Sequence, residues 1–579
     1  MRKIKQIAVF ILVAVLGAPT WAGCRTKLNE MGNEEVDPTM SQLYVLNYNG
    51  GFGSDWLMKA RDRFEETYKD TSFEDGKKGV QIMIEPTKEL SGTLKMAWKV
   101  RTFDVAFAES LQGYNDWVRE GLLYDITDAV TEPLTEYGDA KSVKDKLNAA
   151  QDSFFKVDGK YYGIPHYAGY GGIVYDRDLF DKNCLYLRAD WRSYVTDVAD
   201  SNQWADAFVA KLTDAKAPGP DGDAATDYDN GLPATYEEFF LLCNYIADIG
   251  LTPLTWTGQH YAGYFQFTQL AMRANYDGAE QTNLWTSLDG AATKLAASVT
   301  AVPGAAVGNV TLAPPLTINA ANAVEKGPEL YKGAGLYYAD KFIETVFNTP
   351  KWYDPAKQFS PTHSHIDAQS DFLYSSLEPG QKDIAMLFES TWWESESNSV
   401  ITRMTERYGE RASKFNRNFQ FMPLPHPTEA QIGQKGTILD SMVSLGMIRA
   451  GIPEWRAELG KKFLRFVNTD ESLKEFTVTT NTTKALDYPM DEADLAKMSN
   501  FGRSVYDTQN RSDMAVQFSS NPLFVYNSQH FTIYALKTRI NGTAYAPITG
   551  MHINKFTAEQ VFNGYYAHGQ DIFSKMIVG

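Results

Sequence analysis

The chain has few of the residues that build disulfide frameworks and metal sites. Its 579 residues include 3 cysteines and 8 histidines. Apart from Cys24, only Cys184 and Cys243 remain, and two cysteines make no disulfide framework. Cys243 falls on the apolar face of a predicted helix, where a buried free thiol is common, so we expect two reduced thiols, although the two could pair in an exported protein. No convergent set of histidines and acids is visible, and we expect no metal and no cofactor.

Catalytic signatures are also missing. The sequence contains no Gly-x-Ser-x-Gly, no His-Glu-x-x-His and no phosphate-binding loop. A retaining glycosidase needs two carboxylates about 5–5.5 Å apart, a role conceivable for Glu109 with Glu389 or Glu394. No motif supports such a pair. We therefore expect that the protein is not an enzyme. A surface-anchored glycoside-active enzyme is the alternative that belongs to another class of function.

Excess positive charge is absent as well. The formal charge is −17, and it becomes −20 once Arg2, Lys3 and Lys5 are removed with the leader described below. Such a balance argues against nucleic acid and anionic lipid as partners and is compatible with a neutral ligand. After the first residues, no stretch reaches the roughly 20 apolar residues that a membrane-spanning helix needs.

The first residues have the pattern of an export signal. Basic residues precede an apolar run, Ile7–Leu16, of about ten residues, which is too short to span a bilayer. The run ends at Trp21-Ala22-Gly23-Cys24, which resembles the bacterial lipobox. We expect a lipoprotein signal at 1–23, a lipidated Cys24 and a solvated tether over 24–40. The alternative is ordinary cleavage after Ala22, which leaves Cys24 as a free thiol.

Strand and helix signals alternate through much of the remaining chain, as in an α/β protein. Capping boxes at Thr235 and Thr557 predict two helix starts, and Ser54 a third. The aspartate-rich loop 214–231 fails the calcium-loop pattern, and we expect it to be solvated. A mature chain of this length is expected to split into at least two domains. Strands are predicted at 43–46, 80–84, 104–107, 173–175 and 384–388.

One run, VDGKYYGIPHYAGYGGIVYDRDLF (157–180), resembles the first inter-lobe crossing of extracellular solute-binding proteins of family 1, the maltose-binding type. Further segments resemble that family in the family's order. They are FDVAFAESLQGYNDWVREGLLYDIT (103–127), LPATYEEFFLLCNYIADIGLTPLTW (232–256), DIAMLFESTWWESE (383–396) and KKFLRFVNTDESLKEFTVTTN (461–481). The matches extend across most of the mature chain.

The resemblance implies a two-lobed periplasmic-binding-protein type II fold with a ligand cleft between lobes that crossing segments join. Its implied function is the binding subunit of a carbohydrate ABC importer, which captures an oligosaccharide by hinge closure and delivers it to the permease. We expect an exported monomer, lipid-anchored at the outer face of the cytoplasmic membrane. A polyamine or peptide receptor is the alternative. The expected division is 41–163 in lobe 1, 164–434 in lobe 2 with an insertion of loops and short strands at 287–330, a return to lobe 1 at 435–484, and a C-terminal helical segment at 485–579 packed mainly on lobe 2.

Sugar sites combine aromatic platforms with fixed hydrogen-bonding groups, because unpaired buried polar groups are costly. The resemblance puts Trp392 at the family's stacking tryptophan and Glu109 at a hydroxyl-binding acid. The family's ligand-contacting acid is lost at Gly169, which suggests that Tyr167 or Tyr170 replaces it. Because adjacent side chains diverge, one of Trp392 and Trp393 is expected to pack into the lobe. The other candidates are Tyr48 and Asn49, for which a simple strand-to-helix turn is the equal alternative, together with Trp256 and Asp440.

Overall fold

The computed structural model describes residues 33, 35–87, 91–100, 103–109, 111–210, 213–441, 444–532 and 535–577, without the side chains of 91–94, 100, 109, 111 and 112. The predicted signal segment and Cys24 therefore lie outside the described residues, and so does the side chain of Glu109. Within these ranges, no helix combines the length and apolarity that crossing a membrane requires.

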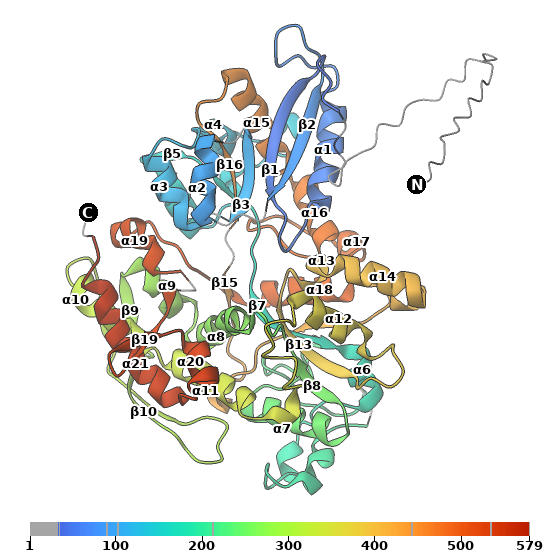
Figure 1. Ribbon diagram of the computed structural model, residues 1–579, viewed down its shortest axis with the longest axis vertical. Coiled ribbons are helices and arrows are strands. Elements are labelled where there is room, and N and C mark those ends of the chain that lie inside the picture. The colour runs from blue at the N-terminus through green and yellow to red at the C-terminus, as the bar shows by residue number, and fades with distance from the viewer. Residues whose placement is uncertain are drawn as a thin grey trace, which may run out of the picture.

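Lobe 1, at the top of Figure 1, is built on a five-stranded sheet in the order β2-β1-β3-β16-β6. Strands β1, β2 and β3 are parallel, and β16 runs antiparallel to β3. The strands are β1 (Ser41–Tyr48), β2 (Val80–Thr87), β3 (Val105–Glu109), β6 (Ile164–Pro165) and β16 (Ser444–Ile448). Around it lie α1 (Asp55–Thr67), α2 (Ser91–Val100), α3 (Leu111–Arg119), α4 (Thr127–Thr131), η1 (Thr135–Tyr137), η2 (Lys144–Lys146), α5 (Ala149–Phe155), β4 (Lys156–Val157), β5 (Lys160–Tyr161), α15 (Glu454–Phe466) and α16 (Asp470–Thr480).

Lobe 2 has a four-stranded sheet in the order β14-β7-β13-β8, in which β8 and β13 are parallel and β7 is antiparallel to both neighbours. Its strands are β7 (Gly171–Asp176), β8 (Thr252–Thr255), β13 (Ile384–Ser390) and β14 (Phe419–Met422). The surrounding elements are α6 (Arg177–Asn183), η3 (Trp191–Ser193), η4 (Ser201–Ala207), α7 (Tyr236–Asp248), η6 (Pro350–Trp352), α12 (His365–Ser375), α13 (Trp393–Glu396), α14 (Asn398–Tyr408), η7 (Glu410–Ala412), η8 (Glu429–Gln431) and α18 (Asn500–Arg511). Helix α17 (Glu492–Leu495) packs on α16 of lobe 1.

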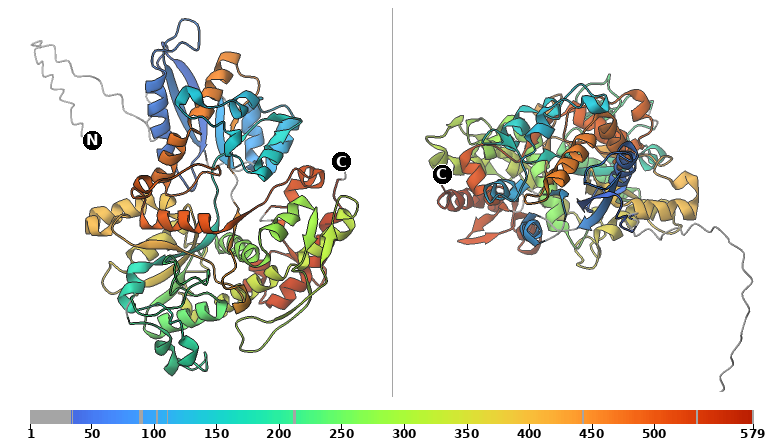
Figure 2. Two further views of the ribbon diagram at one scale, coloured as in Figure 1. Left: turned by 180° about the vertical axis from the view of Figure 1, so that it is seen from behind. Right: turned by 90° about the horizontal axis from the view of Figure 1, so that it is seen from above.

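A largely helical group lies beside the lobe 2 sheet and brings together distant parts of the chain. Figures 1 and 2 show green elements of the middle of the chain against the red C-terminal helices. Helix α21 packs on η5 and α11, and α11 packs on α8. The group comprises α8 (Tyr261–Asp277), α9 (Ala279–Ser287), β9 (Gly290–Ala292), β10 (Ala296–Thr300), β11 (Asn309–Leu312), β12 (Leu316–Ile318), α10 (Ala323–Lys326), η5 (Gly327–Lys332), α11 (Ala334–Phe347), α19 (Pro522–Asn527), η9 (Ser528–His530), β18 (Thr538–Ile540), β19 (Thr543–Tyr545), α20 (Pro547–Ile553) and α21 (Ala558–Phe573).

The chain passes between the lobes at strand ends that face each other. The first crossing leaves β6 and enters β7 at Gly171, which pairs with Ser390 at the carboxyl end of β13. The return passes through β15 (Thr437–Asp440), which pairs with β17 (Asp513–Val516). It enters β16 at Ser444, opposite Glu109 at the carboxyl end of β3. A ligand between the lobes would therefore meet the carboxyl ends of β1, β3, β8 and β13, where α/β proteins place their ligands.

Local predictions from sequence are confirmed at the strands and caps. The five predicted strands correspond to β1, β2, β3, β7 and β13, and both capping boxes form. Cys184 and Cys243 are free thiols, and Cys243 is buried. The insertion at 287–330 contains the expected short strands and also short helical pieces. The prediction of a solvated loop at 214–231 is wrong in part, because Asp229 is only 1% exposed.

Candidate functional site

The two lobes touch at Trp392, which follows the carboxyl end of β13. A Cβ atom added to Gly51, in the loop after β1, would lie 3.3 Å from the Trp392 Cβ. Gly51 has φ +65°, a conformation that favours glycine, so the lobe 1 backbone can rest directly on the indole side chain. From lobe 2, the ring of Phe267 on α8 packs edge-on against Trp392 at 5.8 Å between ring centroids. Trp392 is consequently 7% exposed.

The loop that covers Trp392 is held by its own polar side chains. Ser54 donates through Oγ to Asn49 Oδ1 at 3.0 Å, and Asn47 donates through Nδ2 to Ser54 Oγ at 3.0 Å. The Tyr48 ring folds back over Gly50, where an added Cβ would lie 2.6 Å from the hydroxyl. These contacts favour the turn interpretation for Tyr48 and Asn49, because both side chains shape the loop.

Two acids meet beside the Trp392 loop, at the end of β13. Gln369 on α12 donates through Nε2 to Glu389 at 3.3 Å and to Glu396 at 2.9 Å. Burial, and then the negative charge of Glu396, raise the pKa of Glu389 well above its usual value. Its protonated, neutral form is therefore favoured. A neutral carboxyl can donate a hydrogen bond as well as accept one, which suits recognition of hydroxyl groups.

Glu394 ties helix α13 of lobe 2 to the segment that leaves lobe 1. Its Oε2 accepts hydrogen bonds from Asn481 Nδ2 at 2.6 Å and from Ser499 Oγ at 2.8 Å. Asn481 is the C-cap residue of α16, and Ser499 is the N-cap residue of α18. Glu394 is 2% exposed, and burial raises its pKa. This carboxyl is therefore a structural link between the lobes.

The crossings are joined by two buried contacts. Asp440 accepts the Gly169 backbone N–H through Oδ1 at 3.1 Å, which links the outgoing and returning crossings. Lys484 Nζ lies 2.6 Å from His166 Nδ1. Burial lowers the pKa of both groups well below their usual values, since the Lys484 amine is surrounded by aromatic rings, including those of Trp56 and Phe476. The hinge therefore contains an amine and an imidazole whose charged forms are both disfavoured by burial.

Several predicted ligand contacts are buried in this conformation. Trp256 is 0% exposed and donates through Nε1 to the Gln358 carbonyl at 2.6 Å. Trp393 is also 0% exposed, so it is the member of the tryptophan pair that packs into the lobe. Tyr170 is buried and donates to the Val505 carbonyl at 2.8 Å, and Tyr167 packs edge-on against Phe52 at 4.4 Å. In this conformation none of these rings presents a free face between the lobes.

Sequence reasoning missed the partners of Trp392. Gly51 is not among the predicted site residues, and Phe267 lies in a helix without any motif. The signal for Gly51 is its place in a Gly-Gly-Phe-Gly loop at the end of a strand. Gln369 and Glu396 gave no signal, because their meeting depends on how α12 packs beside β13. Among the described residues, no group of three or more histidines, cysteines or acids is placed to hold a metal ion.

Solved structures share this arrangement over nearly the whole chain. A chitin oligosaccharide binding protein matches with a TM-score of 0.53 and 13% identity, covering 92% of this chain and 99% of that one. The solute-binding protein RafE, solved in complex with raffinose, matches with a TM-score of 0.52 and 12% identity, covering 92% and 100%. The fold is that of two-lobed solute-binding proteins. No protein-family model and no curated protein sequence matches the chain.

Proposed function

We propose that this protein is the substrate-binding lipoprotein of a carbohydrate ABC importer, of the maltose-binding type, and that it captures an oligosaccharide between its lobes. The observation that carries the proposal is the position of Trp392, an indole at the carboxyl end of β13 that the opposite lobe covers through Gly51. An indole face is the kind of platform on which the apolar face of a sugar ring stacks. Both structural neighbours described above bind oligosaccharides, by their names.

The mechanism follows from the contact between Gly51 and Trp392. With the two in van der Waals contact, no sugar ring fits between them, so a ligand that stacks on Trp392 enters only when the lobes separate. The lobes then close on the ligand. Because the ligand binds the closed state more tightly than the open state, it raises the population of the closed state. Glu389 and Glu396 lie next to this platform and would pair with sugar hydroxyls. Lipid attachment at Cys24 and delivery to a permease complete the proposed role.

The test uses residues 25–579 and two titrations, one with raffinose and chitin oligosaccharides and one with polyamines and dipeptides. A ligand that binds only the native state stabilises it by about 2.7 kcal/mol at a hundredfold excess over Kd, which a thermal shift detects. We expect a shift with a sugar that Trp392→Ala abolishes. A shift with a polyamine or peptide alone would contradict the sugar assignment.

The enzyme alternative is tested in the same samples. Chromatography of each oligosaccharide after prolonged incubation is expected to return it intact. Cleavage that disappears in Glu389→Gln would replace the receptor proposal with a glycoside-active enzyme.

A further inference from the structure

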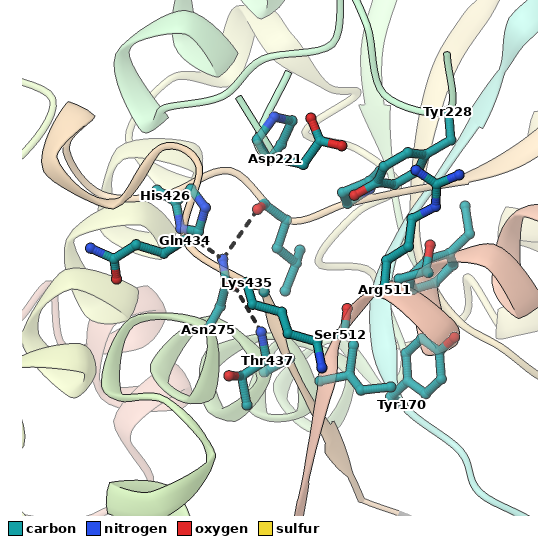
Figure 3. Close-up of a pocket in the computed structure, with 18 of the residues that line it drawn as sticks. Tyr170, Asp221, Tyr228, Asn275, His426, Gln434, Lys435, Thr437, Arg511 and Ser512 are labelled. Atoms are coloured by element: carbon teal, nitrogen blue, oxygen red, sulfur yellow. Dashed lines mark hydrogen bonds between the residues drawn. The ribbon is translucent and has the colours of Figure 1, made fainter. Parts of the chain in front are cut away.

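A cavity of about 340 Å³ lies against the hinge within lobe 2, apart from Trp392. Its walls come from the start of β7, helix α8, strand β15, the carboxyl end of α18 and the loop 220–228. No residue of the lobe 1 sheet and none of the Trp392 contacts is among the residues that line it. Figure 3 shows hydroxyl, amide and charged side chains around the cavity, with the ring of Tyr170 at one side.

The charged groups of this cavity already have partners. Lys435 is paired with Asp513 at 2.5 Å, and the Arg511 guanidinium lies 4.3 Å from the centre of the Tyr228 ring. Asp221 accepts the Thr226 hydroxyl at 2.6 Å. The lining carries two acids, Asp221 and Asp223, and two bases, Lys435 and Arg511, so its formal charges balance, and an ionic ligand would compete with these interactions. The cavity therefore favours a neutral molecule.

The remaining wall has the mixed character of a sugar site. Tyr170 and Phe421 contribute apolar ring surface, while Thr437 and Ser512 contribute hydroxyls. Asn275 is held in one orientation, since Nδ2 donates to the Leu424 carbonyl at 3.2 Å and Oδ1 accepts the Thr437 N–H at 3.3 Å. Fixed polar groups on an apolar wall are what orients a small ligand.

A buried histidine supports a ligand with hydroxyl groups. His426 is 2% exposed, its Nδ1 lies 3.4 Å from Asn275 Nδ2, and its Nε2 has no hydrogen bond of ordinary geometry with the described residues. Burial lowers the pKa of His426 to about 4, against the smaller opposing effect of a hydrogen bond with the Pro220 backbone. A buried imidazole in this wall can exchange hydrogen bonds with a hydroxyl group.

We propose that this hinge cavity is a second binding site, for a neutral polyhydroxylated molecule of monosaccharide size. The cavity volume is near the lower end of the range of about 300–1,000 Å³ for small-molecule sites. The inference does not rest on the solute bound at Trp392, because the two sites share no lining residue.

Gly436 offers a direct test. Its backbone does not adopt a positive φ, and an added Cβ would lie 3.5 Å from Ser512 Oγ and 3.6 Å from Asn275 Oδ1, both ordinary contacts. Gly436→Val therefore fills the cavity without a clash at the Cβ. Ser512→Phe fills it from the neighbouring segment and serves if the first variant does not fold. Ala496→Val, at an exposed position outside the cavity, is the matched control.

Saturation-transfer NMR with D-glucose, D-galactose and N-acetylglucosamine measures binding to residues 25–579. We expect transfer to at least one sugar in the wild type, Trp392→Ala and Ala496→Val, and at least a fivefold loss in the folded cavity variants. The proposal would be overturned by transfer that survives in the cavity variants or disappears in Trp392→Ala. It would also be overturned if the wild type showed no transfer to any of the three sugars. Failure of oligosaccharide binding at Trp392, with monosaccharide transfer retained, would affect only the proposed function.

Discussion

Trp256 and Trp392 occupy equivalent places in lobe 2 and have different surroundings. Each follows the carboxyl end of one of two neighbouring parallel strands, β8 and β13. Trp256 is covered by its own lobe, through the rings of Tyr353 and Phe359 and the carbonyl of Gln358. Trp392 is covered from the other lobe by Gly51. A position at a strand end is therefore insufficient to define a binding residue. Whether the tryptophan ring can meet a ligand depends on which segment of the protein covers it.

The largest expected effect is a difference in the free energy of unfolding between the alanine variants of Trp256 and Trp392. Trp256→Ala should lower the free energy of unfolding by about 3–5 kcal/mol, because it empties a packed core site. Trp392→Ala should cost clearly less, because part of its burial depends on lobe closure. Urea unfolding of both variants measures the difference. Equal losses would show that Trp392 is also a core residue of lobe 2.

The second test removes the tie beside Trp392. Glu394→Ala leaves Asn481 and Ser499 without their buried acceptor, and about 1–3 kcal/mol of stability should be lost. Urea unfolding gives the value, and Glu406→Ala, at an exposed position on α14, is the control. A loss no larger than that of the control would mean that the link carries no stability.

The third test concerns the approach of Gly51. Gly51 and Gly53 have φ values of +65° and +67°, but nothing lies within 4 Å of an added Cβ at Gly53. Alanine at either position costs about 1–2 kcal/mol of backbone strain, and only Gly51→Ala also presses on Trp392. Small-angle scattering should show a larger radius of gyration for Gly51→Ala than for Gly53→Ala. Identical radii would mean that the contact does not hold the lobes together.

The smallest effect is a pH dependence at Glu389. Its folded pKa is raised by burial and by Glu396, so the folded protein holds a proton that the unfolded chain releases above its ordinary pKa of about 4.5. The stabilising contribution of the neutral form is complete at low pH and declines as the pH rises. The side chain of the Glu389→Gln variant cannot ionise. The Tm of the variant relative to that of the wild type should therefore rise between pH 5 and pH 8. A constant Tm difference would contradict the raised pKa.

The local elements could be read from the sequence because their causes are local. Thr235 and Thr557 cap their helices through residues three positions away, and the apolar run 384–388 has the length of a buried strand. The two-lobed fold followed from ordered segments that resemble one family. The candidate contacts stay predictions, and their burial could not be read from the sequence, because Trp256, Trp393 and Tyr170 look the same in sequence whether a ring faces a cleft or a core.

The sequence by itself determined the strands, the helix caps and the placement of an indole at the end of β13, because each depends on neighbours within a few residues. Only the tertiary structure decided which ring the opposite lobe covers, which acids meet at Gln369, and that loop 220–228 closes a cavity with β15 and α18. Those contacts join residues far apart in the chain. Their geometry depends on packing between whole elements, which no local pattern encodes.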